Sequence, residues 1–169
     1  MYSSFFGFTE KPFELAPDSK FLYLNHARRE ALVTILKVVK YRLGFIAIIG
    51  EAGTGKTTII EFLLENIDKN YKVVRVCNKI GSFDNLLKMV LSELGLMGKN
   101  EKINESEAIK TLHSFSNNQM RNDGNVVIVI DDAHNLDRMC LENLRLFSDL
   151  QTDNQNLVQV ILSGRPELE

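Results

Sequence analysis

Hydrophobic and polar positions along the 169-residue chain form two patterns, one typical of helices and one typical of buried strands. After Asn25, apolar residues recur three or four positions apart as far as Leu43, which predicts a first helix. Uninterrupted apolar runs at Phe45–Ile49 and Val126–Ile130 are typical of strands buried on both faces of a parallel sheet. The same reasoning predicts further helices over 55–69, 82–95, 104–122 and 137–150, and further strands over 73–77 and 157–163. Strands that alternate with helices predict an α/β fold with a mostly parallel sheet.

The first 24 residues differ from this pattern, because they are rich in aromatic side chains and contain Pro12 and Pro17. The two prolines exclude a continuous helix, and the aromatic side chains need a surface to cover. We therefore expect an irregular arm over 1–24, packed on a single core domain over 25–169.

Composition places the chain among ordinary soluble domains, with 44% apolar and 25% charged residues. A net charge of −2 provides no cationic field for a polyanion, so DNA is allowed but not indicated. The apolar runs are too short to span a membrane, and the N-terminus lacks the features of a secretory signal, so we expect a cytoplasmic location. Cys77 and Cys140 lie far apart, which argues against a zinc site or a disulfide.

A phosphate-binding loop is predicted between the first strand and the second helix. The motif G-x-x-x-x-G-K-[ST] comprises Gly50, Glu51, Ala52, Gly53, Thr54, Gly55, Lys56, Thr57 and Thr58. Its glycines allow backbone N–H groups to point at phosphates, and the following helix adds its positive N-terminal end. Lys56 is expected to reach the β- and γ-phosphates of ATP, and the Thr57 hydroxyl is expected to be a ligand of Mg²⁺.

Two carboxylates follow the strand at Val126–Ile130, at the edge of the sheet where the phosphate loop is expected. Asp131 is the predicted metal-binding acid, and Asp132 is predicted to orient or deprotonate an attacking water. A strand that ends in two acids is a weak signal alone. It gains weight here because a complete strand and helix separate it from Lys56.

The remaining titratable residues are less informative. His26, His113 and His134 share no metal-ligand spacing, and only His134 lies close enough in sequence to contact the acids. The simplest interpretation of the basic residues of the first helix is a solvated face; these are Arg28, Arg29, Lys37, Lys40 and Arg42.

Among phosphate-loop proteins, three classes are open to the chain. A signalling GTPase should carry N-K-x-D, but Asn78-Lys79-Ile80 is followed by Gly81. A small-molecule kinase normally carries an arginine-rich lid, and the sequence has no such insertion. The class that remains is the ATPase class in which an extra strand separates the strand before the phosphate loop from the strand before the acids.

Several short motifs accompany the phosphate loop along the chain: Met1-Tyr2, Phe5-Phe6-Gly7-Phe8, Pro12-Phe13, Pro17-Asp18, Phe21-Leu22-Tyr23, Ala31-Leu32, Gly44-Phe45, Asp131-Asp132-Ala133-His134 and Gly164-x-Pro166-Glu167-Leu168. In these motifs and the phosphate loop, the chain resembles the AAA+ ATPase domain of the general secretion pathway protein A family. The resemblance extends over nearly the whole chain. Related ATPases serve pilus biogenesis and transposition.

This resemblance implies a three-layer P-loop NTPase sandwich of AAA+ type with sheet order 5-1-4-3-2. It also implies a homo-oligomer with ATP and Mg²⁺ at subunit boundaries, whose partner is a secretion or pilus assembly protein. Ser163 would then be a polar sensor near the γ-phosphate. Asn78 would be able to pair with the catalytic acid, and the arm around Tyr23 would pass near the adenine.

Two features depart from the family pattern. The family usually has Asp-Glu-Ala-Gln where this chain has Asp131-Asp132-Ala133-His134, and a catalytic group displaced by ~1 Å can lose of order 100-fold in rate. The sequence also ends at Glu169, before the fifth strand, arginine finger and helical lid of the family, so we expect a fragment whose first strand lies at an exposed edge.

The preferred interpretation is an ATP-hydrolysing domain that energises assembly of a secretion or pilus complex. The alternatives are a nucleotide-gated binding module with little turnover, a transposition-helper ATPase and, third, a P-loop kinase.

Overall fold

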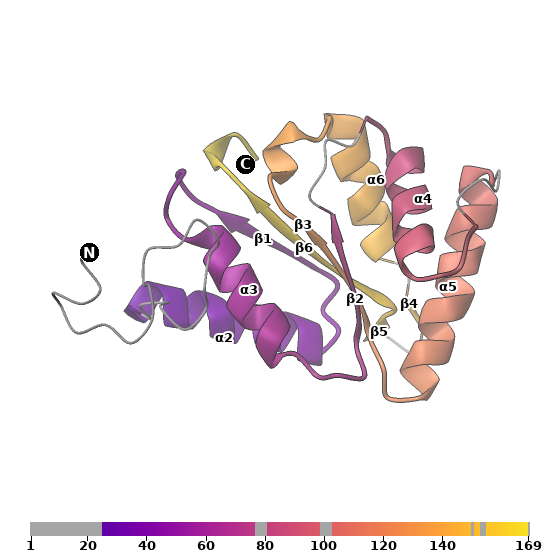
Figure 1. Ribbon diagram of the computed structural model, residues 1–169, viewed down its shortest axis with the longest axis horizontal. Coiled ribbons are helices and arrows are strands. Elements are labelled where there is room, and N and C mark those ends of the chain that lie inside the picture. Colours follow the sequence, from indigo (N-terminus) through magenta and orange to yellow (C-terminus); the bar gives the residue numbers. More distant parts are fainter. Residues whose placement is uncertain (1–24, 77–80, 99–102, 150, 153–154, 169) are drawn as a thin grey trace, which may run out of the picture.

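A four-stranded parallel sheet forms the centre of the protein (Figure 1). The computed structural model describes residues 25–76, 81–98, 103–149, 151–152 and 155–168, so the predicted arm over 1–24 lies outside the described residues. The strands lie in the order β1 (Phe45–Ile49), β6 (Val158–Gly164), β3 (Val126–Ile130) and β2 (Lys72–Val76). For these four strands the order 5-1-4-3-2 is confirmed, since β6 lies between β1 and β3.

Helices cover both faces of the sheet, which confirms the three-layer α/β prediction (Figure 1). They are α2 (His26–Lys40), α3 (Lys56–Asn66), α4 (Phe83–Glu93), α5 (Glu105–Arg121) and α6 (Arg138–Ser148). The first two pack on one face, α4 and α6 pack on the other, and α5 packs against α4. No described helix is both long and apolar enough to cross a bilayer.

Helix starts agree closely with the sequence because polar caps define them. The side chain of Asn25 accepts a hydrogen bond from the Arg28 backbone N–H at 2.9 Å, and Asn104 forms a reciprocal capping box with Glu107. The helices end one to three residues earlier than the apolar pattern predicts. The short segments η2 (Ala133–Asn135), η3 (Pro166–Leu168), β4 (Gln151–Thr152) and β5 (Gln155–Asn156) were not predicted.

Successive side chains of each strand point to opposite faces of the sheet, and this alternation divides the core into two clusters. On β3, Val127 and Val129 face α2 and α3, whereas Val126, Ile128 and Ile130 face the opposite layer. Strand β3 is buried along its whole length, as its apolar run predicts. The alternation continues at the strand end, and it directs Asp131 to the same side of the sheet as α3.

The prediction that β1 is buried on both faces is wrong, whereas the expectation that it lies at an exposed edge is confirmed among the described strands. Ala47 and Ile49 are exposed, and Ile49 retains 38% of its accessible surface. The reason is its position, because β1 pairs with β6 on one side and no described strand pairs with it on the other. An edge strand in a parallel sheet keeps the apolar composition of a central strand, so composition alone does not distinguish the two.

Arg42 is also not part of a solvated face. Its backbone is left-handed, with φ of 53°, and its guanidinium donates to the Asn125 side chain at 3.1 Å and to the Gly124 carbonyl. Burial lowers the pKa of Arg42 from its usual value. Arg42 therefore joins the end of α2 to the start of β3, at the edge of the sheet opposite the phosphate loop.

A buried glutamine near the start of β6 stabilises the same edge. The Gln159 side chain accepts a hydrogen bond from the Gly44 N–H at 2.8 Å and donates one to the Asn156 carbonyl at 2.9 Å. Leucine at this position would leave both backbone groups buried without a partner. We expect Gln159→Leu to reduce the free energy of unfolding by about 2–4 kcal/mol in urea titrations.

The matched control for this change is Gln155→Leu, because Gln155 is exposed in β5. Its free energy of unfolding should stay within about 0.5 kcal/mol of the wild-type value. Equal stability of Gln159→Leu and the wild type would show that these two hydrogen bonds contribute nothing to the fold.

Candidate functional site

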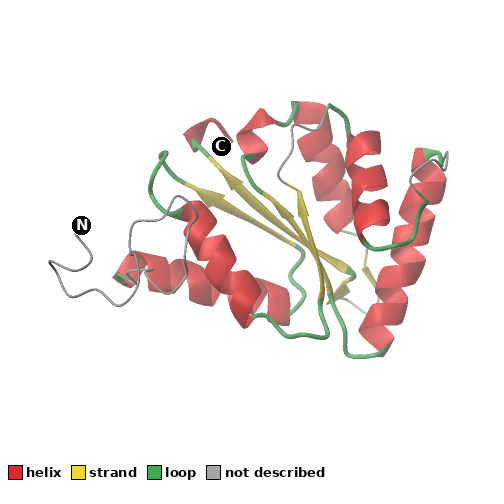
Figure 2. Cartoon of the chain, in the orientation of Figure 1, coloured by secondary structure: helices red, strands yellow, loops and turns green. Residues whose placement is uncertain are grey.

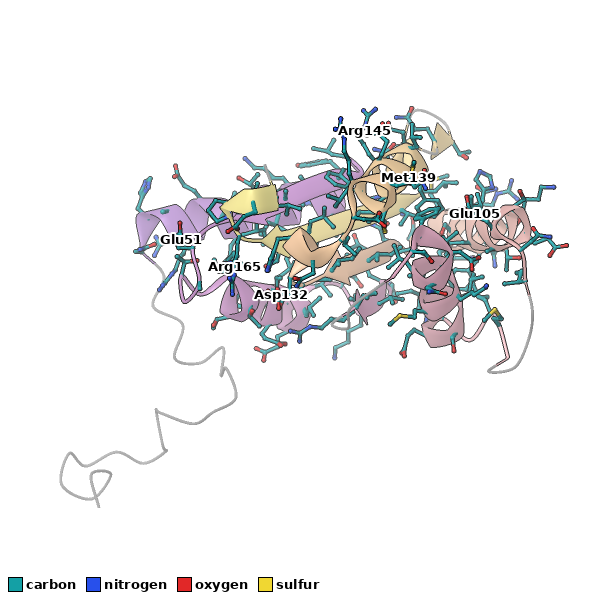
Figure 3. All side chains as sticks on the ribbon, turned by 90° about the horizontal axis from the view of Figure 1, so that it is seen from above. Glu51, Glu105, Asp132, Met139, Arg145 and Arg165 are labelled. Atoms are coloured by element: carbon teal, nitrogen blue, oxygen red, sulfur yellow. The ribbon has the colours of Figure 1, made fainter. Side chains whose placement is uncertain are left out.

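The loops that follow β1, β3 and β6 meet at one edge of the sheet, the edge formed by the carboxyl ends of the strands (Figure 2). Figure 3 shows three labelled side chains from these loops, Glu51, Asp132 and Arg165, along one side of the molecule. In open α/β sheets, ligands bind beyond the carboxyl ends of the strands. The sequence motif and the sheet topology therefore both indicate a ligand site at the carboxyl ends of the strands.

The predicted phosphate loop has the backbone of an anion-binding cradle. Gly53 and Gly55 adopt left-handed conformations, with φ of 76° and 89°, and helix α3 begins directly afterwards at Lys56. A Cβ atom at Gly53 would meet no heavy atom within 4 Å, so the space beside this turn is open. The first N–H groups of α3 have no partner within the helix and are available to an anion in that space.

Lys56 holds the loop in this shape. Its ammonium donates to the carbonyl oxygens of Gly50 at 2.7 Å and Glu51 at 2.9 Å. An ammonium has three donors, so one remains for a ligand. Arg28 adds a contact that the sequence did not predict, since its guanidinium donates to the Thr54 carbonyl at 3.1 Å. Arg28 is thus a loop-binding residue and not part of a solvated face.

Thr57 and Asp131, the predicted metal ligands, are in direct contact. The Thr57 hydroxyl donates to Oδ2 of Asp131 at 3.0 Å, and Oδ1 of Asp131 accepts the Asp132 N–H at 3.0 Å. The Asp131 side chain is only 14% exposed. A hydroxyl and a carboxylate are hard oxygen ligands, so this donor set fits Mg²⁺ that is also bound by phosphates and water.

Arg75 is a charged neighbour of this pair that the sequence analysis missed. It lies on β2, donates a hydrogen bond to Glu61 of α3, and has its Nη2 atom 3.7 Å from Oδ2 of Asp131. All three side chains are less than one third exposed. The available signal was an arginine inside the otherwise apolar run of β2, which indicates a charged partner on the helix above it.

Asp132 lies in a more open position than Asp131. Its side chain is 73% exposed, and its backbone is left-handed, with φ of 54° and ψ of 37°. Nδ1 of His134 lies 3.9 Å from Oδ1 of Asp132, so the suggested proximity of His134 to the acids is borne out. The Asp132 carboxylate is therefore free to approach a ligand in the space above Asp131.

Ser163 is beside Asp131 in the sheet, but it does not line the hollow around the phosphate loop. It lies on β6 one position after Leu162, which pairs with Ile130 of β3. Its side chain is fully buried, and its hydroxyl has no hydrogen-bond partner in the described structure. Asn78 and Tyr23, the other two positions that the resemblance suggested, lie outside the described residues.

Two hollows flank the loop. One, of about 350 Å³, is lined by Ala52, Gly53, Gly55, Lys56, Thr57, Thr58, Asp131, Asp132 and Arg165. We call it the phosphate hollow. The second, of about 390 Å³, is lined by Asn25, Ala27, Arg28, Ala31, Ile48, Ile49, Thr54, Lys56 and Ile59. Lys56 borders both, so one elongated ligand with a charged end and an apolar end could occupy them together.

The other candidate chemical groups do not form sites among the described residues. No three or more His, Cys, Asp or Glu side chains gather there in a way that could hold a metal ion. Cys140 is buried in α6, and burial together with the nearby Asp137 carboxylate raises the pKa of its thiol to about 11. Cys140 is thus a neutral core residue at physiological pH.

Comparison with known proteins gives the family. The sequence model of the AAA domain family matches residues 39–169, which is most of the chain and includes every residue of the phosphate hollow. The chain belongs to the AAA domain family. This membership agrees with the sheet order, and the P-loop NTPase fold of AAA+ type is thereby confirmed.

The AAA domain is also similar to a longer curated protein. General secretion pathway protein A of Aeromonas hydrophila is 31% identical to it over 173 residues, an alignment that covers 100% of this chain and 31% of that protein. The chain therefore spans about a third of the length of this relative. The resemblance drawn from the sequence is thus confirmed.

Solved structures share the fold of the AAA domain at low sequence identity. Cdc6p from Pyrobaculum aerophilum has a TM-score of 0.63 and 18% identity, covering 93% of this chain and 42% of that one. The Aeropyrum pernix ORC2 protein, solved as ADPNP–ADP complexes, has a TM-score of 0.59 and 16% identity, covering 83% and 42%. At such identities the similarity concerns the fold alone.

Proposed function

We propose that this AAA domain binds ATP together with Mg²⁺ in the phosphate hollow and hydrolyses the nucleotide. The observation that carries the proposal is the convergence of Lys56, Thr57 and Asp131, from two separate loops, on one open hollow. The three groups provide a cation for phosphate oxygens and two oxygen ligands for a metal. Few ligands other than a nucleotide with its metal need both at once.

The second hollow fits the rest of the nucleotide. Ala31, Ile48, Ile49 and Ile59 give it apolar walls, while Asn25 supplies a polar group at its border. A planar base packs against apolar side chains and is oriented by few polar groups. We therefore assign the base and ribose to this hollow and the triphosphate to the hollow on the other side of Lys56.

For hydrolysis, each side chain has a defined task. Lys56 would bind the β- and γ-phosphates with its remaining donor, while Thr57 and Asp131 would hold Mg²⁺. Bound Mg²⁺ supplies neutralisation of the charge that develops on the phosphate oxygens. Asp132, whose carboxylate borders the hollow, would orient the attacking water and accept its proton.

A nucleotide titration tests the proposal directly. A fluorescent ATP analogue should bind the chain in the presence of Mg²⁺ and be displaced by unlabelled ATP, and chelation of the metal should weaken its binding. Release of phosphate from ATP then measures turnover. Failure of ATP to bind under both conditions would refute the site assignment.

A nucleotide-gated binding module is the second candidate. It is favoured by Asp132, which is one methylene shorter than the family's usual glutamate and mostly exposed. In this case ATP binding would order a partner surface with little turnover. The two candidates share the binding site and differ only in the chemical step.

The Arg75–Glu61 pair gives a prediction about the metal. Arg75 places a positive charge beside Asp131, and Glu61 compensates for it. Arg75→Gln should therefore raise the apparent affinity for Mg²⁺ during ATP binding by about three- to tenfold. Glu61→Gln should lower this affinity by a similar factor. Isothermal titrations of ATP at several Mg²⁺ concentrations measure both effects.

Lys72→Gln is the matched control, because Lys72 is an exposed cation at the opposite end of β2. It should leave the Mg²⁺ dependence unchanged. Changes of the same sign in Arg75→Gln and Glu61→Gln would contradict the electrostatic argument and indicate a purely structural pair.

We further propose that the domain acts as a homo-oligomer that energises assembly of a secretion or pilus complex in the cytoplasm. The name of the Aeromonas hydrophila relative supports the secretion role. A related role as a transposition helper is the alternative. The net charge of −2 provides no general attraction to DNA, so DNA binding is not part of the proposal.

A further inference from the structure

A buried histidine nitrogen lies next to the exposed carboxylate of Asp132. The side chain of His134 is only 14% exposed, and its Nδ1 atom has no hydrogen-bond partner within the described part of the chain. This atom lies 3.9 Å from Oδ1 of Asp132, whose side chain is 73% exposed. A buried polar atom without a partner is unfavourable, so the position of Nδ1 requires an explanation.

The backbone that carries the histidine is held in place by packing. His134 lies in η2, where the Leu136 N–H donates to the carbonyl of the fully buried Ala133 at 3.0 Å. A Cβ atom on Gly164 would lie 3.4 Å from the backbone nitrogen of His134, so η2 packs closely on the end of β6. The imidazole therefore projects from a well-packed turn beside the phosphate hollow.

The Asp132 carboxylate is less well fixed than its own backbone. The Asp132 N–H donates to Oδ1 of Asp131 at 3.0 Å, which anchors the backbone beside that acid. Among the described residues, only His134 has a side chain in polar contact with the Asp132 carboxylate. A catalytic group has to be held within about 0.5 Å of its productive position, so an exposed carboxylate needs such a partner.

We propose that His134 is a positioning residue for hydrolysis: its Nδ1–H donates a hydrogen bond to Oδ1 of Asp132 and leaves Oδ2 to orient the attacking water. This inference rests on the proposed function. A hydrogen bond from such an N–H to a carboxylate is about 2.7–2.9 Å long, so the exposed carboxylate would move about 1 Å toward the ring from its present 3.9 Å. The imidazole keeps its proton throughout.

The kinetics of ATP hydrolysis test this role. His134→Ala should lower kcat by about 10- to 100-fold, the loss expected when a catalytic group is displaced by about 1 Å. KM and the dissociation constant of ATP should stay within about twofold, because His134 does not line the phosphate hollow. His134→Asn keeps an N–H donor close to the place of Nδ1 and should recover most of the lost turnover.

A double substitution shows whether His134 acts through Asp132. In a chain that already carries Asp132→Ala, adding His134→Ala should lower single-turnover phosphate release by less than about twofold, because the group that the histidine positions is gone. Equal fold losses with and without Asp132 would overturn the inference. So would an unchanged kcat in His134→Ala.

Nitrogen-15 NMR of the histidine rings tests the pairing in the nucleotide-free chain. His134 should give the ring signals of a proton held on Nδ1, and Asp132→Ala should remove this signature. The chain also contains His26 and His113, so the signals of His134 are identified by their absence from the His134→Asn spectrum. Unchanged His134 signals in Asp132→Ala would overturn the inference whatever the turnover.

His113→Ala is the matched control, because His113 is a half-buried histidine of α5, which packs against α4 and supplies no residue to the phosphate hollow (Figure 1). It should change neither turnover nor ATP affinity. Thermal unfolding of each variant shows whether the fold is intact. A wild-type chain that binds ATP without turnover would refute the hydrolysis in the proposed function, and the role of His134 with it, whereas loss of turnover confined to His113→Ala would refute the role of His134 alone.

Discussion

Replacing Lys56 with alanine should abolish measurable ATP binding. Lys56 is the lysine that lines the phosphate hollow, and its ammonium lies on the carbonyl oxygens of Gly50 and Glu51, where a triphosphate would pass. Hydrogen bonds to charged groups contribute about 1.5–3 kcal/mol each, so loss of the one phosphate contact, together with the two contacts that shape the loop, should weaken binding at least about 100-fold. Titration with a fluorescent ATP analogue measures the effect.

Lys69→Ala is the control for loss of one positive charge, since Lys69 is exposed beyond the end of α3. Its ATP affinity should equal that of the wild type. The thermal unfolding midpoint of Lys56→Ala should also be measured, because the lysine stabilises its own loop. An ATP affinity of Lys56→Ala close to that of the wild type would exclude the phosphate hollow as the binding site.

Replacing Asp132 with asparagine should reduce ATP turnover by about 100- to 10,000-fold with little change in ATP affinity. The amide cannot accept a proton from water, but it keeps the size of the carboxylate. Asp132 is also mostly exposed, so the substitution removes no buried contact. Steady-state phosphate release, with ATP affinity measured in parallel, separates the chemical step from binding.

Asp132→Glu restores the side-chain length that is usual in the family and should retain or increase turnover. This variant decides between the two candidate functions. A wild-type chain that binds ATP without turnover, and that gains turnover with Asp132→Glu, would be a nucleotide-gated module. Full turnover in Asp132→Asn would remove Asp132 from the mechanism.

Features that depend on local sequence were predictable. The strand β3 follows from five consecutive β-branched residues, and helix starts follow from caps such as Asn25 and Asn104. The phosphate loop is recognisable in the sequence because its left-handed backbone at positions 53 and 55 favours glycine there. The pairing of Thr57 with Asp131 was also accessible, because the carboxyl ends of the parallel strands β1 and β3 lie at the same edge of the sheet.

Features that depend on partners distant in the sequence were not predictable. Arg28 and Arg42 resemble a solvated helix face by spacing, yet their partners are Thr54 and residues 124–125. The contact of Arg75 with Asp131 likewise depends on the pairing of β2 with β3. A single sequence provides residue types and periodicity, but it does not provide the register that brings such side chains together.

The pairing of β1 with β6 also has a consequence for how the protein is made. Phe45 of β1 pairs with Val160 of β6, which the ribosome adds near the end of this segment. Until β6 has left the exit tunnel, β1 has no described neighbour in the sheet, and its apolar side chains need shielding from other nascent chains. The phosphate loop begins at the end of β1, and the hydrogen bond from the Gly50 N–H to the Gly164 carbonyl cannot form until β6 has been made.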